Sequence, residues 1–151
     1  MRRFALFCSV ALLLGCARTE DRPAEDVTTT AADEATISSA DVAGSWKLRA
    51  TDEAGGNVVE TQLNATAGTT GWTWTRPDGT VVPLTVVAIA GDSIVLESGQ
   101  YESALRAGVP VRSRLVFQLR ENRLVGHIEA RYMLSTGDSV AHRPAEGTRM
   151  P

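Results

Sequence analysis

The chain is poor in cysteine: its 151 residues contain two, Cys8 and Cys16, and both lie near the N-terminus. The residues after Cys16 therefore offer no disulfide, no thiolate metal site and no cysteine nucleophile. From Asp41 onward no segment has the apolar periodicity of an amphipathic helix. These absences favour a domain that is rich in β-structure and has no thiol chemistry.

The N-terminal segment MRRFALFCSVALLLGC has the three parts of a secretory signal. Arg2 and Arg3 supply the positive start, and Phe4–Leu14 is almost continuously apolar. As a helix this run spans only about 18 Å, whereas the apolar core of a bilayer is about 30 Å thick. We therefore expect residues 1–15 to be a cleaved signal peptide and not a membrane-spanning anchor.

The end of this segment, Leu13-Leu14-Gly15-Cys16, resembles the lipobox of bacterial lipoproteins. The resemblance implies that Cys16 becomes the first residue of the mature chain and carries acyl chains, several of which hold a protein durably on a membrane. Because Ala17 and not aspartate follows the cysteine, the same analogy favours the outer membrane of the cell envelope, with the protein facing the periplasm. An ordinary signal peptide with a chance cysteine is the alternative.

Residues 17–40 are rich in Ala, Thr, Asp and Glu and poor in large apolar side chains. Such a stretch cannot bury enough surface to offset its ordering entropy, so we expect residues 16–40 to form a flexible acidic linker before a single domain at 41–151. Loss of Arg2 and Arg3 with the signal leaves 13 basic against 18 acidic residues. This acidic balance argues against a nucleic-acid partner.

Closely spaced turn signals divide the domain into short, β-branched and alternating segments. Examples are Gly55-Gly56-Asn57, Pro77-Asp78-Gly79 and Glu121-Asn122. About eight strands with short connections describe an up-and-down antiparallel sheet, and closure into a β-barrel would remove the edges of that sheet. The predicted strands are 45–52, 57–66, 70–76, 80–89, 93–99, 111–120, 123–134 and 138–143.

Two hairpins indicate which side chains face the interior of the predicted barrel. A two-residue loop at Glu121-Asn122 pairs Phe117 with Gly126, and a slip of one residue would bury arginines. The Pro-Asp-Gly turn pairs Trp74 with Val82. The residues predicted to line the interior, either as a solid core or around a ligand, are Trp46, Leu48, Trp72, Trp74, Leu84, Phe117, Ile128 and Tyr132.

Gly91-Asp92-Ser93 resembles the nucleophile block of a large family of serine esterases, but it lies between two predicted strands. The tripeptide recurs at Gly137-Asp138-Ser139, again between strands, as expected for a two-residue turn in which glycine supplies a positive φ. The chain has no G-x-S-x-G motif and lacks the downstream Asp-x-x-His of that family. We therefore predict no catalytic residue and no enzyme activity.

A metal site is not expected at the two histidines. A two-residue turn at Gly137-Asp138 places His142 opposite Met133, about 20 Å along the strand from His127. We therefore expect both histidines to belong to a polar, solvated face and not to form a pair of metal ligands. The sequence predicts neither a metal nor another cofactor.

The first predicted strand begins with Gly44-Ser45-Trp46. This Gly-x-Trp resembles the signature of the calycins, the lipocalin and avidin-like families. The resemblance implies a barrel whose end is closed by Trp46, with an arginine of the last strand packed across the indole. The turn at Gly137-Asp138 would pair Tyr132 with Arg143 and point Arg143 inward, so Arg143 is the predicted partner of Trp46. A frayed last strand with Arg143 in water is the alternative.

Two functions remain open for the barrel. One is a lipid-anchored binding module that holds a small hydrophobic ligand, with residues 99–111 as a lid, a rim or a plain surface loop. The other is a solid barrel, filled by its own tryptophans, that serves as a structural or interaction component of the envelope. Glu97 belongs to the cavity if the pairing across Gly91-Asp92 is regular, and to the surface if a bulge intervenes.

Overall fold

The computed structural model describes residues 36–52, 55–137 and 139–151. The predicted signal peptide (1–15), the predicted lipidation residue Cys16 and most of the predicted linker lie outside the described residues. Among the described residues, no helix combines the length and the apolar character needed to cross a membrane.

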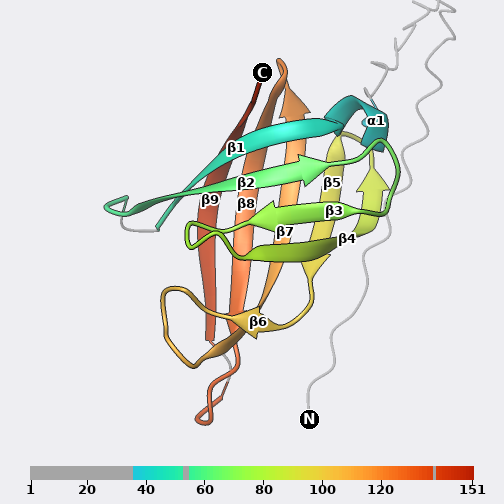
Figure 1. The fold of residues 1–151 in the computed structure, drawn as a ribbon. Coiled ribbons are helices and arrows are strands. Elements are labelled where there is room, and N and C mark those ends of the chain that lie inside the picture. Colours follow the sequence, from blue (N-terminus) through green and yellow to red (C-terminus); the bar gives the residue numbers. More distant parts are fainter. Residues whose placement is uncertain (1–35, 53–54, 138) are drawn as a thin grey trace, which may run out of the picture. The chain divides into compact units, whose positions relative to one another are not determined.

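Eight antiparallel strands close into an up-and-down barrel, which confirms the predicted fold class (Figure 1). Neighbouring strands pair in chain order, except that strand five pairs with strand seven, and the last strand returns to the first to complete the ring. Strand six lies outside the ring and pairs only with the start of strand seven. The strands are β1 (Gly44–Thr51), β2 (Val58–Ala65), β3 (Trp72–Thr75), β4 (Val81–Ala90), β5 (Ser93–Ser98), β6 (Tyr101–Glu102), β7 (Pro110–Arg120), β8 (Arg123–Tyr132) and β9 (Ser139–Arg149).

The β7–β8 hairpin has the predicted register, in which Phe117 pairs with Gly126. Its loop residues Glu121 and Asn122 have φ angles of 48° and 60°, as a type I′ turn requires. A Cβ atom on Gly126 would lie 1.9 Å from the carbonyl oxygen of Val116, so only glycine fits at this position. The β3–β4 hairpin also has its predicted register, with Trp74 opposite Val82.

A short helix, α1 (Ser39–Val42), precedes the barrel and covers one of its ends. The Ser38 hydroxyl accepts from the backbone N–H of Asp41, while the Asp41 carboxylate accepts from the backbone N–H of Ser38, which is a capping box. Ile37 and Val42 are buried in the barrel core. Residues from Ile37 onward therefore pack with the barrel, ahead of the boundary predicted at residue 41.

The last strand, β9, departs from the prediction in both length and register. It runs to Arg149, whereas its predicted end was residue 143, and it pairs Ile128 with Arg143 and Tyr132 with Ser139. The predicted two-residue turn at 137–138, which paired Tyr132 with Arg143, is wrong because a longer connection joins β8 to β9. The observed register extends the pairing along the whole of β8, so the backbone groups of β8 find partners as far as Arg123.

Candidate ligand pocket

The end of the barrel beside α1 is closed by Trp46 and an arginine. Trp46 is wholly buried, and its indole N–H donates to the Val42 carbonyl oxygen at 2.7 Å. The arginine across its ring is Arg149, whose guanidinium carbon lies 4.2 Å from the ring centroid. The Arg149 guanidinium also donates to the carbonyl oxygens of Ala43 and of Asp41, the latter at 2.9 Å. The indole nitrogen of Trp46 and all three guanidinium nitrogens of Arg149 therefore have hydrogen-bond partners.

The predicted pair of Trp46 with Arg143 is therefore wrong in its second member. Arg143 does face the interior, but it lies on β9 opposite Ile128, whereas Arg149 lies opposite Trp46 itself. The two arginines are six positions apart on β9, so their side chains point to the same face of the sheet but lie towards opposite ends of the barrel. The Gly-x-Trp resemblance indicated that an arginine of the last strand is required; the misplaced β8–β9 turn led to the wrong one.

The half of the barrel next to Trp46 is filled by side chains. Trp72 is 1% exposed, and its indole N–H donates to the Gly68 carbonyl oxygen at 2.8 Å. Gly147 leaves room for the side chains of Leu48 and Leu124 on the adjacent strands. Five of the eight predicted lining residues belong to this solid core and are not part of the wall of the cavity in the other half: Trp46, Leu48, Trp72, Leu84 and Phe117.

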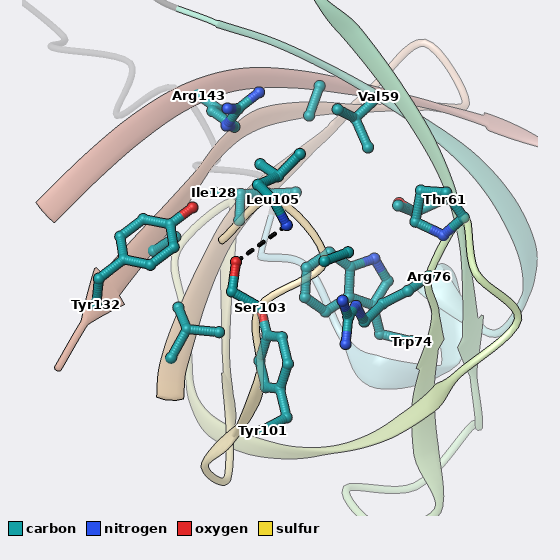
Figure 2. A pocket seen from close by; sticks show the side chains of 15 residues that line it. Val59, Thr61, Trp74, Arg76, Tyr101, Ser103, Leu105, Ile128, Tyr132 and Arg143 are labelled. Atoms are coloured by element: carbon teal, nitrogen blue, oxygen red, sulfur yellow. Dashed lines mark hydrogen bonds between the residues drawn. The ribbon is translucent and has the colours of Figure 1, made fainter. Parts of the chain in front are cut away.

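The other half of the barrel contains a cavity of about 90 Å³. The remaining three predicted lining residues, Trp74, Ile128 and Tyr132, form part of its wall (Figure 2). Small and aliphatic side chains make up most of the rest, so the wall is largely apolar. Residues that the sequence did not assign to the lining are Ala50, Val59, Thr61, Arg76, Pro77, Tyr101, Ser103, Ala104, Leu105, Val111, Ala130 and Arg143.

The connection between β6 and β7 covers this cavity, at the end of the barrel away from α1 (Figure 1). The Ser103 hydroxyl accepts from the backbone N–H groups of Leu105 and Arg106, at 3.1 and 3.0 Å, which folds the loop into a turn. Glu102 accepts from the backbone N–H of Gly108 at 2.9 Å. Leu105 borders the cavity although it is 57% exposed, so the loop forms a thin rim over the pocket (Figure 2).

Arg76 ties this rim to the barrel. Its side chain is buried; it donates to the Glu102 carbonyl oxygen at 2.7 Å and forms an ion pair with Asp78 at 3.2 Å. Its guanidinium carbon also lies 5.0 Å from the centroid of the Tyr101 ring. The Tyr101 hydroxyl contacts the Ser113 hydroxyl at 2.6 Å, yet burial raises the pKa of Tyr101 above its ordinary value. Tyr101 therefore stays neutral at the pocket wall.

Three polar atoms in the pocket wall are buried and have no hydrogen-bond partner among the described residues. They are Oγ1 of Thr61, Nε1 of Trp74 and Nη1 of Arg143. The three residues come from β2, β3 and β9, and Figure 2 shows them around one space. Buried polar groups are nearly always paired in proteins. The cavity therefore differs from the end at Trp46, where the hydrogen-bond donors of Trp46 and Arg149 are already engaged.

The charge in the pocket wall is of one sign. Arg76 and Arg143 both line the cavity, and no aspartate or glutamate is among the lining residues. Asp52 lies near enough for the charge of Arg143 to help lower its pKa, but hydrogen bonds from Asn57 and Gly56 are the larger causes. The Asp52 carboxylate is therefore engaged by its own turn and is not a direct partner of Arg143.

Glu97 lies outside the barrel. The register of β4 and β5 shifts between Val86 and Ala88, so Glu97 pairs with Thr85 and its carboxylate forms an ion pair with Arg114 at 2.6 Å. The bulge alternative is thus the correct one. The turn interpretation of Gly91-Asp92 is also confirmed, because Ala90 pairs with Ser93 across it.

The histidines lie closer together than predicted. His142 pairs with Glu129, one alternate position from His127 along β8, and so the predicted pairing with Met133 is wrong. Both histidines are exposed on the outer face. Among the described residues, no group of three potential metal ligands comes together.

No family model matched the chain, and the searches of curated proteins and of solved structures found no match. The functional argument therefore depends on the geometry of the pocket.

Proposed function

We propose that this protein is a lipid-anchored component of the bacterial cell envelope whose lipocalin-like barrel binds a small hydrophobic ligand at its open end. The observation that carries the binding proposal is the division of the barrel: one half is filled by its own side chains, and the other holds an apolar cavity under a thin rim. Binding sites are typically apolar concavities with a few polar groups that converge on them.

The size of the cavity limits the ligand. At about 90 Å³ it is smaller than an engineered core cavity of about 150 Å³ that accepts benzene. A long lipid chain does not fit between Trp74 and Tyr132. The ligand is either small as a whole or extends past Leu105, whose exposure shows that the rim is thin.

The binding proposal is tested by adding hexanol, a linear molecule that can extend past Leu105, to the ¹⁵N-labelled full chain and following backbone amide shifts. We expect saturable shifts at Val111, Ile128 and Tyr132, and loss of these shifts in Ala130→Trp, which fills the cavity. Val125→Trp, with the same added bulk on the exposed face of β8, is the matched control and should bind normally. Equal shifts in the two variants, or no shifts in the wild-type protein, would favour the solid structural barrel.

The anchoring proposal depends on the lipobox resemblance and has its own test. Cells fed an alkyne analogue of palmitate should label the wild-type protein, which should sediment with outer-membrane fractions. Cys16→Ser should lose both the label and the membrane association, whereas Cys8→Ser, within the predicted signal, should keep them. Equal labelling of Cys16→Ser would overturn the anchor and leave the binding proposal untouched.

A further inference from the structure

The three unpartnered atoms of the pocket indicate what the ligand must offer. The Trp74 indole and the Arg143 guanidinium can only donate hydrogen bonds, and the Thr61 hydroxyl can donate or accept one. A wholly apolar occupant would leave all three unsatisfied in a buried site, which is unfavourable. The complementary ligand therefore carries a hydrogen-bond acceptor that reaches these donors.

The chain satisfies the same chemical groups elsewhere. The indoles of Trp46 and Trp72 each donate to the carbonyl oxygen four residues earlier in the chain, that of Val42 and of Gly68. Trp74 is the exception; the carbonyl oxygen four residues before it, that of Thr70, accepts from Thr66 at 2.6 Å instead. The unpartnered N–H of Trp74 thus lies where the barrel is hollow and not where it is filled.

The arginines differ in the same way. Arg76 borders the pocket, but its guanidinium is engaged by the Glu102 carbonyl oxygen and by Asp78. Nη1 of Arg143 is buried in the pocket wall and has no such partner among the described residues. Since Arg143 is a cation with an unpartnered donor and no acidic side chain is among the lining residues, the acceptor that fits best is an anion.

We propose that the pocket binds a small monocarboxylate with a short apolar tail, an inference that rests on the proposed binding function. A carboxylate is compact, and its two oxygens accept from several donors at once. It receives hydrogen bonds from Arg143, Trp74 and Thr61, while the tail lies against the aliphatic wall of Ala50, Val59 and Ile128. A phosphate ester is less well matched, because its larger charge calls for more donors than the three that are free here.

The test compares hexanoate with hexanol and hexyl phosphate, which share one tail and differ in the polar group. Calorimetric titration of the full chain should show one-to-one binding of hexanoate, at least about tenfold tighter than of hexanol. In the ¹⁵N-labelled chain, the indole N–H resonance of Trp74 should shift with hexanoate, while those of Trp46 and Trp72, whose donors are already engaged, should stay in place.

Two variants assign the effect to the pocket. Arg143→Gln should weaken hexanoate about tenfold or more and leave hexanol unchanged, and Thr61→Val should weaken hexanoate less. Arg112→Gln removes the same charge from the exposed face of β7 and should bind hexanoate like the wild type. If Arg143→Gln fails to fold, Thr61→Val and the Trp74 resonance still decide the question.

The outcomes separate this inference from the function on which it rests. If hexanol binds in the pocket as tightly as hexanoate and Thr61→Val changes neither, a binding pocket remains and the carboxylate is wrong. Tighter binding of hexyl phosphate than of hexanoate also overturns the carboxylate in favour of a phosphate ligand. If no probe shifts any pocket resonance, the binding function falls together with the inference.

Discussion

The two ends of the barrel use the same pair of side chains for different purposes. Each end has an inward tryptophan and an inward arginine of β9: Trp46 with Arg149 at the closed end, and Trp74 with Arg143 at the open end. At the closed end the Trp46 indole and both terminal nitrogens of Arg149 donate to backbone carbonyls, and Nε of Arg149 donates to the Asn122 side chain, whereas at the open end Nε1 of Trp74 and Nη1 of Arg143 have no partner among the described residues. The chemistry of a side chain therefore does not reveal its role; the supply of partners around it does.

The difference arises from what covers each end. Ile37 and Val42 insert into the closed end. The carbonyl oxygen of Val42 accepts from Trp46, and those of Asp41 and Ala43 accept from Arg149. The open end is covered by the rim around Leu105, which is largely exposed and offers no hydrogen bond to Nε1 of Trp74 or Nη1 of Arg143. The cover of the closed end completes the core, whereas the cover of the open end leaves a cavity with unpartnered donors.

The largest expected effect comes from removing the indole at the closed end. Trp46→Ala deletes a fully buried side chain and should lower the free energy of unfolding by about 3–5 kcal/mol. Leu105→Ala at the open end should change it by no more than about 0.5 kcal/mol, because this side chain is mostly exposed. Urea denaturation measures both values, and similar losses would mean that the two ends are equally well packed.

Added bulk should also distinguish the halves. Gly126→Ala places a Cβ against the Val116 carbonyl oxygen, a backbone atom that cannot yield, and should cost about 1–3 kcal/mol or more. Ala130→Val, on the same strand beside the cavity, should cost less than about 1 kcal/mol. Thermal unfolding of the two variants provides the comparison; a greater loss for Ala130→Val would show that the cavity wall tolerates no growth.

The arginines of β9 should respond in opposite ways. Arg149→Gln loses the contact with the Trp46 ring and charge-assisted hydrogen bonds, and should lower stability by about 1–2 kcal/mol. Arg143→Gln removes an unpartnered buried donor and a charge, so in the absence of ligand its stability should equal or exceed that of the wild type. A loss at Arg143 as large as that at Arg149 would contradict a binding role for Arg143.

The smallest effect is a gain at the open end. Thr61→Val replaces an unpartnered hydroxyl by a methyl group of similar size and should raise the free energy of unfolding by about 1 kcal/mol. Thr66→Val removes a hydroxyl that donates to the Thr70 carbonyl oxygen and should lower it by a similar amount. Both are measured by urea denaturation without added ligand, and a loss in Thr61→Val would show that its hydroxyl is satisfied.

The strand pairings that could be predicted are those with short, chemically specified turns. Glu121-Asn122 and the Pro-Asp-Gly turn each imposed one register, and the structure has both. The β8–β9 connection resembled these turns in sequence because it contains Gly137. It is longer, however, and a long loop does not impose a register. The resulting error moved the predicted closing arginine from Arg149 to Arg143.

The candidate site was predicted only in part. The alternation of side chains identified the inward residues, and all eight predicted lining residues are buried. Alternation does not show where along the barrel axis the interior is filled, so five of them turned out to be core. Thr61 and Arg76 were missed because a polar side chain on an inward face interrupts the alternation of apolar and polar residues. Such interruptions were the sequence signal that indicated a site.

By itself the sequence determined the β class, the closed up-and-down order and the turns of the tight hairpins, because these follow from a period of two residues and from local backbone chemistry. Only the tertiary structure decided which end is solid, which arginine covers Trp46, and that Trp74, Thr61 and Arg143 meet without partners. Those features depend on the summed volumes and hydrogen-bond partners of strands that are distant in the chain, which no local pattern contains.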